Sequence, residues 1–236
     1  MRPIGFSTGA LARGDFRRAL ALLQAHQVKI VELSALRMEE LEPLLAALPT
    51  LDLESFTFIS IHAPSRFDQR AERRVVEILG GWEAGNYPVV VHPDFVFTPS
   101  LWRQLGRRLL IENMDKRKPV GRTVPELGSL FKLLPDAKFC FDIGHARQVD
   151  PTMTEATLLL QAFGERFAEV HISEVNTASR HDPISRNATS AFQRVARFIP
   201  QETPIILESL IDEGQSEMDV EIRRARQALS VERLVA

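Results

Sequence analysis

Cysteine is almost absent from this sequence, which contains only Cys140. A single cysteine excludes an internal disulfide and is typical of a reducing compartment, so we expect a cytoplasmic protein. Long apolar runs are also lacking, since none approaches the ~20 residues that cross a membrane. The first residues, from Met1 onward, have the pattern of a strand and not of a secretion signal. We therefore expect no membrane partner.

An excess of one charge is lacking too. The 29 lysines and arginines are balanced by 31 aspartates and glutamates, for a formal net charge of −2, so no overall positive field attracts nucleic acid. The only dense basic run is 116–118. No basic cluster alternates with aromatic residues, as binding of single-stranded nucleic acid would require. We expect a small-molecule substrate rather than nucleic acid, although a local basic patch would suffice for the latter. The oligomeric state stays open.

The composition is that of an ordinary globular protein, with 44% hydrophobic and 25% charged residues. A length of 236 residues exceeds the common domain size of roughly 100–150 residues but suits one α/β barrel of about 250. The sequence has no internal repeat, low-complexity segment or linker. We therefore expect one domain over residues 1–236.

Eight apolar segments predict strands, at residues 3–7, 29–33, 56–62, 88–92, 109–112, 138–142, 167–172 and 204–208. Helical periodicity and capping residues predict a helix after each strand, at 15–27, 39–48, 66–82, 98–108, 123–135, 154–163, 190–198 and 216–229. Most of the strands are continuously apolar, which is typical of parallel strands buried on both faces. The pattern predicts a single (β/α)8 TIM barrel, with a doubly wound open sheet as the alternative.

Most of these strands end in a side chain that can bind a metal or move a proton. In one segment, an apolar run from Phe139 stops at Asp142, Gly144 allows a tight turn, and His145 follows. In a barrel the carboxyl ends of all strands meet at one face, where active sites lie. We therefore expect a metal site at that face, formed by His62, His92, Glu112, Asp142, His145, His171, His181 and Glu208.

Carboxylates and imidazoles without a thiolate suit Zn²⁺, Mn²⁺, Co²⁺ or Fe²⁺, and we expect Zn²⁺ or Mn²⁺. Any one of these histidines alone would be explained as a hydrogen-bonded residue near a strand end, and His26, within a helical pattern, is expected to be structural. Five of them together with three acids would bury charge at a high cost unless a cation compensates. We expect one ion per chain, or two or three if all the histidines bind metal.

The strand ends resemble those of the xylose isomerase-like TIM barrel superfamily, which includes sugar isomerases, epimerases and endonuclease IV. The resemblance runs from the first predicted strand to the eighth. Members share four metal ligands, a Glu, an Asp, a His and a Glu on strands five to eight. The resemblance implies that Glu112, Asp142, His171 and Glu208 form this set.

The other histidines are similar to those of endonuclease IV, which holds three zinc ions. The resemblance assigns His62 and His92 to strands three and four, His145 to an Asp-x-x-His motif, and His181 to the loop after strand seven. The sequence departs from the pattern at Ser179, where that enzyme has an aspartate. This departure predicts a weak third site, unless Asp182 supplies the missing carboxylate.

The superfamily implies two competing activities. The first is an isomerase or epimerase of a small sugar or sugar phosphate, in which one Lewis-acidic metal stabilises an enediolate. Glu112 and Glu208 would then be the acid–base pair, and His145 or Arg180 would hold a substrate oxygen. The compact loops and Ser179 favour this activity, which we predict from the sequence.

The alternative is a phosphoesterase with two or three metal ions, in which Glu112 bridges two ions and His62 and His92 complete one of them. His92 favours this alternative, and a small phosphoester would then be a better substrate than DNA. A third hypothesis is a metal-binding scaffold without catalysis. Because arginine matches phosphate geometry, Arg66 and Arg147 are candidates to hold a phosphate, and with Arg180 they are the expected substrate-binding residues. Glu32 either reaches the barrel mouth or pairs with a basic residue lower in the barrel.

Overall fold

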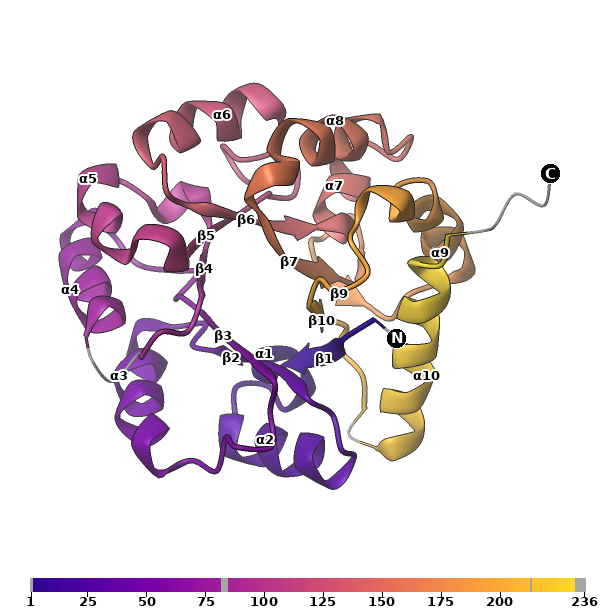
Figure 1. Cartoon of the computed structure of the whole chain (residues 1–236), viewed down its shortest axis with the longest axis horizontal. Helices are drawn as coiled ribbons and strands as arrows, with labels where there is room; N and C mark the ends of the chain where they lie inside the picture. Colours follow the sequence, from indigo (N-terminus) through magenta and orange to yellow (C-terminus); the bar gives the residue numbers. More distant parts are fainter. Residues whose placement is uncertain (1, 82–84, 213, 232–236) are drawn as a thin grey trace.

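The computed structural model describes residues 2–81, 85–212 and 214–231. Its eight parallel strands close into a barrel in the order β1-β10-β7-β6-β5-β4-β3-β2 (Figure 1). The strands are β1 (Ile4–Ser7), β2 (Ile30–Ser34), β3 (Phe58–His62), β4 (Val89–Val91), β5 (Leu109–Glu112), β6 (Lys138–Asp142), β7 (Phe167–Ile172) and β10 (Ile205–Leu207). This is the predicted TIM barrel, and the open-sheet alternative is not realised.

Helices surround the barrel and cover its outer face (Figure 1). They are α2 (Phe16–Ala25), α3 (Met38–Ala47), α4 (Gln69–Gly80), α5 (Pro99–Trp102), α6 (Val124–Leu133), α8 (Thr154–Phe163), α9 (Arg186–Gln193) and α10 (Gln215–Ala228). In α4 the buried Val75, Val76 and Leu79 recur at helical spacing, which explains why this segment forms a helix on the strands. The predicted end of this helix at residue 82 lies outside the described residues.

Two helices start more than one residue away from the predicted position, and the helices predicted at 98–108 and 190–198 end earlier, at Trp102 and Gln193. Helix α4 begins after Asp68, whose carboxylate accepts hydrogen bonds from the amides of Arg70 and Ala71. Helix α9 begins after Ser185, four residues before the predicted start, because the Ser185 hydroxyl accepts from the amide of Ala188. In both places a side-chain cap close to the helix determined the boundary.

Two short helices follow strands where we expected loops, namely α1 (Thr8–Leu11) and α7 (Ile143–Val149). The expected tight turn at Gly144 is wrong, because Asp142 caps α7 by accepting from the amide of His145 at 2.7 Å. Gly144 is needed for a different reason: a Cβ there would lie 2.5 Å from Ser173 O. The helix carries His145 back over the barrel mouth.

The loop after β7 folds into an antiparallel hairpin of β8 (Glu174–Val175) and β9 (His181–Asp182). Its two strands bring His181 to the same face of the barrel as the strand ends. No helix in the described part of the chain has the length and apolar character to cross a membrane.

The barrel interior is unusually polar for this fold, in which inward layers are commonly bulky and apolar. A small apolar cluster of Val90, Leu110 and Cys140 occupies part of it. Glu32 on β2 and Glu169 on β7 are both fully buried, and both extend toward His171. The larger apolar core lies between the strands and the helices.

Candidate metal centre

The carboxylate of Glu112, at the end of β5, lies at the middle of the strand-end cluster. Its Oε2 is 3.3 Å from His62 Nε2 and 3.2 Å from His92 Nε2. Its Oε1 is 3.3 Å from His145 Nδ1 and 3.5 Å from His171 Nδ1. Because Glu112 is only 1% exposed, one buried carboxylate is surrounded by four imidazoles, with a different pair facing each oxygen.

The four ligands that the superfamily shares converge as predicted. The donor atoms of Glu112, Asp142, His171 and Glu208 all lie within 4.8 Å of one another. Asp142 Oδ2, His171 Nδ1 and Glu208 Oε2 are buried without a hydrogen-bond partner among the described residues. Leaving such atoms unpartnered is costly, and one divalent cation would satisfy all three. The residues at this site therefore fit a metal ion.

Three further groups of donor atoms are equally close, and two of them consist of predicted ligands: His62 with His92 and Glu112, and Asp142 with His145 and His181. In the first of these two, His62 Nδ1 lies 2.8 Å from Ala63 O, so this nitrogen carries a proton and donates it. His62 Nε2 faces Glu112 and can offer its lone pair to a metal once the proton on this nitrogen is displaced. All eight predicted ligands thus lie in these two groups and the set of four.

Glu32 and Glu169 lie beneath His171 and away from the barrel mouth. His171 Nε2 is 3.1 Å from Glu32 Oε2 and 3.3 Å from Glu169 Oε1. Glu169 also accepts a hydrogen bond from Ser60, and the second oxygen of Glu32 accepts one from Ser34. The two carboxylates therefore hold the Nε2–H of His171 from below, and Nδ1 is left facing the metal ligands. Glu32 pairs with a basic residue inside the barrel, which was one of the two predicted outcomes.

Replacing both carboxylates with amides, E32Q with E169Q, should raise the Kd of the ion bound by His171 about 10–100-fold, because the imidazole loses the charges that orient it. The number of ions per chain should not change. Competition with a coloured chelator measures both quantities, and S60A, which removes only a hydroxyl from Glu169, should bind metal as the wild type does. Loss of a whole ion would show instead that Glu32, which also forms a close group with His62 and His171, is itself a ligand.

Burial and mutual attraction push the pKa values of the acidic ligands apart. Burial by itself would raise the pKa of Glu112, but His92, His145 and His171 outweigh it and hold this pKa well below its usual range. Burial raises the pKa of Glu208 to about 8 despite the attraction of His171. Without metal, one carboxyl at the site is charged near neutral pH and its neighbour holds a proton.

The histidines also divide into two kinds. Burial opposes the protonation of His62 and His145, but the carboxylates beside them prevail and raise their pKa values to about 9 and about 10. Burial, reinforced by the charge of His145, lowers the pKa of His181 to about 3. His181 is therefore a neutral imidazole at pH 7, while His62 and His145 carry protons that a metal must displace.

Metal binding at pH 7 should release protons, on the order of three per chain, since His62, His145 and Glu208 are protonated in the metal-free protein. Because these pKa values are raised, affinity should increase as pH rises from 6 toward about 9–10. Calorimetric titration in two buffers with different ionisation enthalpies measures the protons released. A release of zero at pH 7 would contradict the protonation states given above.

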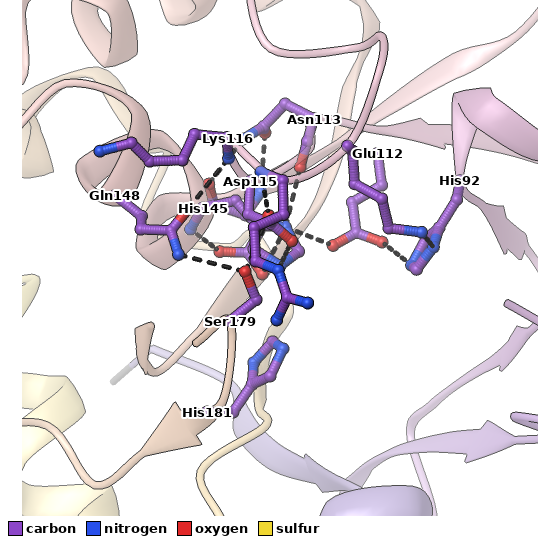
Figure 2. A network of polar contacts seen from close by, with 12 residues as sticks. His92, Glu112, Asn113, Asp115, Lys116, His145, Gln148, Ser179 and His181 are labelled. Carbon is purple, nitrogen blue, oxygen red and sulfur yellow. Dashed lines mark hydrogen bonds and ion pairs between the residues drawn. The ribbon is translucent and has the colours of Figure 1, made fainter. Parts of the chain in front are cut away.

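The predicted weak point at Ser179 has a structural explanation. Asp182 does not replace the missing carboxylate, since its Oδ2 accepts a hydrogen bond from Asn176 Nδ2 at 2.7 Å. The Ser179 hydroxyl instead donates to Asp115 Oδ1 at 2.9 Å, as Figure 2 shows. Asp115 Oδ2 lies 4.0 Å from His145 Nε2. Asp115, in the loop after β5, thus brings a carboxylate toward His145.

A cavity of about 610 Å³ opens above these ligands. Arg66 and Arg180, two of the three arginines that the sequence offered for substrate binding, line it. Arg147 does not line it, because its guanidinium forms an ion pair with Glu174 at 2.9 Å. The role of all three arginines in substrate binding stays a prediction.

Sequence reasoning missed several residues at this site. Asn113 joins the ends of β5 and β6 through two hydrogen bonds with the backbone of Asp142, at 2.8 and 2.9 Å. Lys118 lines the cavity and forms an ion pair with Asp94 at 2.9 Å. Asp115 and Lys118 lie in the loop after β5, which ends in the predicted ligand Glu112, and this position in the sequence could have marked them as residues of the site. Glu169 carried none, because it lies within an apolar strand.

No family model and no curated protein sequence matches the chain. Among solved structures, endonuclease IV from Thermus thermophilus is 20% identical, with a TM-score of 0.64 over 97% of this chain and 99% of that one. A xylose isomerase domain protein from Alicyclobacillus acidocaldarius is 16% identical, with a TM-score of 0.65 over 97% and 98%. D-psicose 3-epimerase is 14% identical, with a TM-score of 0.58 over 97% of each chain.

Fold and strand ends thus define a TIM barrel with a cluster of side chains at its carboxyl-terminal face that could hold a metal ion. At these identities the likeness concerns the fold alone, which is the predicted TIM barrel. The similar structures include both an endonuclease and an epimerase, so the comparison does not distinguish between a phosphoesterase and an epimerase for this chain.

Proposed function

We propose that this protein is a metal-dependent phosphoesterase whose two divalent ions are bridged by Glu112. The observation that carries the proposal is the position of the Glu112 carboxylate, whose two oxygens face different sets of ligands. His62 and His92 would hold one ion, and Asp142, His171 and Glu208 the other. The sequence alone favoured a sugar isomerase or epimerase, but a single-ion enzyme leaves His62 and His92 without a role.

Zn²⁺ or Mn²⁺ suits these imidazole and carboxylate ligands. Such a pair of ions, when bound, supplies an activated water and offsets the charge on a phosphoryl group. Arg180 and Lys118 line the cavity where they can hold the remaining phosphate oxygens. The neutral His181, whose Nδ1 is 2.9 Å from the Ser173 hydroxyl, can offer an uncharged ring nitrogen to a ligand at the cavity wall. We infer a cytoplasmic location only from the single Cys140.

The test combines a metal count with turnover. Protein purified without chelator should contain at least about two ions per chain and should hydrolyse bis(p-nitrophenyl) phosphate or p-nitrophenyl phosphate. About one ion and no turnover of either ester would overturn the proposal. Metal binding without turnover of any ester or sugar would favour the non-catalytic scaffold. An oligonucleotide containing an abasic site, included in the same assays, separates small phosphoesters from nucleic acid.

The second candidate is an isomerase or epimerase of a small sugar or sugar phosphate. It is favoured by the opposite pKa shifts of Glu112 and Glu208, since two carboxyl groups with separated pKa values are typical of an acid–base pair. His145 or Arg180 would then hold a substrate oxygen. Exchange of the hydrogen beside the carbonyl of a ketose for solvent deuterium, with one ion per chain, would support this candidate over the phosphoesterase.

A further inference from the structure

The cavity above the metal ligands has one apolar side. Leu36 and Leu210 line it and are 39% and 45% exposed. Leu36 follows β2 and Leu210 follows β10, and Gly9 and Ala10 of α1 line the cavity after β1. Because β1 lies between β10 and β2 in the barrel, these residues form one continuous wall, which we call the leucine wall.

The opposite side of the cavity is cationic. Arg117 and Lys118 line it and come from the loop after β5, which lies across the barrel from β1 (Figure 1). Two more cations that line the cavity, Arg66 after Ser65 and Arg180 before His181, lie nearer the leucines, since Ser65 bonds to Leu36 O and His181 O accepts from Leu210 N. Lys118 is held by Asp94, and Arg117 donates to the carbonyl oxygen of Ala178, so the two cations are fixed in place.

The hydroxyl groups near the leucine wall are already bonded to the protein. The Ser7 and Ser34 hydroxyls are 2.6 Å apart, and Ser34 also donates to Glu32. The Ser65 hydroxyl donates to the carbonyl oxygen of Leu36. A sugar lying on this side would have to leave hydroxyl groups unpaired or compete for these partners, which is costly in a partly enclosed site.

We propose that the substrate is a phosphoester whose alcohol part is apolar, an aryl or alkyl group rather than a sugar, and that this group lies against the leucine wall. The phosphate faces the metal ligands and the cationic side, and this half of the inference rests on the proposed phosphoesterase function. Hydrolysis adds one water across the phosphorus–oxygen bond, so that the apolar alcohol leaves with a proton and the phosphate is retained by the cations. The leucine wall thus selects the leaving group.

The experiment compares two phosphonates that the enzyme cannot hydrolyse, phenylphosphonate and methylphosphonate, by calorimetric titration of the metal-loaded chain. Phenylphosphonate should bind on the order of tenfold more tightly, because only its ring is large enough to lie on the leucine wall. The double variant L36N with L210N should reduce this ratio to about one without changing the affinity for methylphosphonate. Its KM for phenyl phosphate should rise by a similar factor, with kcat little changed.

Leu133 and Leu158 provide the matched control, since they are 48% and 46% exposed on α6 and α8 and do not line the cavity. The double variant L133N with L158N should keep the wild-type ratio, and a loss there as large as in the wall variant would overturn the proposal. Equal affinity of the two phosphonates for the wild type would also overturn it, while phosphoester hydrolysis with two ions would still support the proposed function. If neither phosphonate nor inorganic phosphate binds the metal-loaded chain, the phosphoesterase function fails, and the proposal fails with it.

Discussion

Replacing Glu112 with glutamine should lower the metal content to less than about one ion per chain and reduce phosphoester turnover by more than ~100-fold. Loss of a residue that only orients a metal ligand already lowers metal affinity or activity by about 10–100-fold. Glu112 contacts both sets of ligands through its two oxygens. The amide of glutamine has one oxygen and no charge, so it cannot bridge two cations. Metal analysis and steady-state kinetics on the same preparation measure both effects.

The control for this variant is E42Q, which also removes one carboxylate. Glu42 lies at the surface in an ion pair with Arg74, and the Glu42 side chain is 59% exposed. Its loss should change neither metal content nor turnover, because exposed ion pairs contribute little. Glu112 would be excluded as the bridging ligand if E112Q, correctly folded by circular dichroism, kept the wild-type metal content.

The substitution H92A should remove about one ion per chain and leave the ion of the four-residue set in place. His92 belongs only to the group with His62 and Glu112, and it is 3.2 Å from Glu112 Oε2. If two ions are needed to hydrolyse the ester, turnover should fall by on the order of 100-fold or more. A sugar epimerase with a single ion would keep both its metal and most of its turnover.

His26 provides the matched control for H92A. It lies at the carboxyl-terminal end of α2, remote from the metal ligands, so H26A should keep the wild-type metal content. A full metal count in H92A, combined with retained hydrolysis of a phosphoester, would refute the assignment of His92 as a ligand. The two histidine variants therefore separate a specific ligand from a general effect of removing an imidazole.

The barrel was predictable because its strands are local, continuous apolar runs. The run that ends at Asp142 and the run that ends at Glu112 are visible in the sequence, and parallel strands bring their ends to one face. The helix α7 was missed because its cap is the ligand Asp142 itself. Its seven residues are too few for helical periodicity to be recognised.

The local sequence pattern was therefore enough to identify the fold and all eight residues of the three ligand groups. Only the closed barrel decided that each oxygen of Glu112 faces a different pair of histidines and that Glu32 holds His171 from below. The same is true of the leucine wall, which lies opposite the cations of the β5 loop. These relations join strands far apart in the chain, and they depend on strand order, register and loop conformation, which no single segment of the sequence contains.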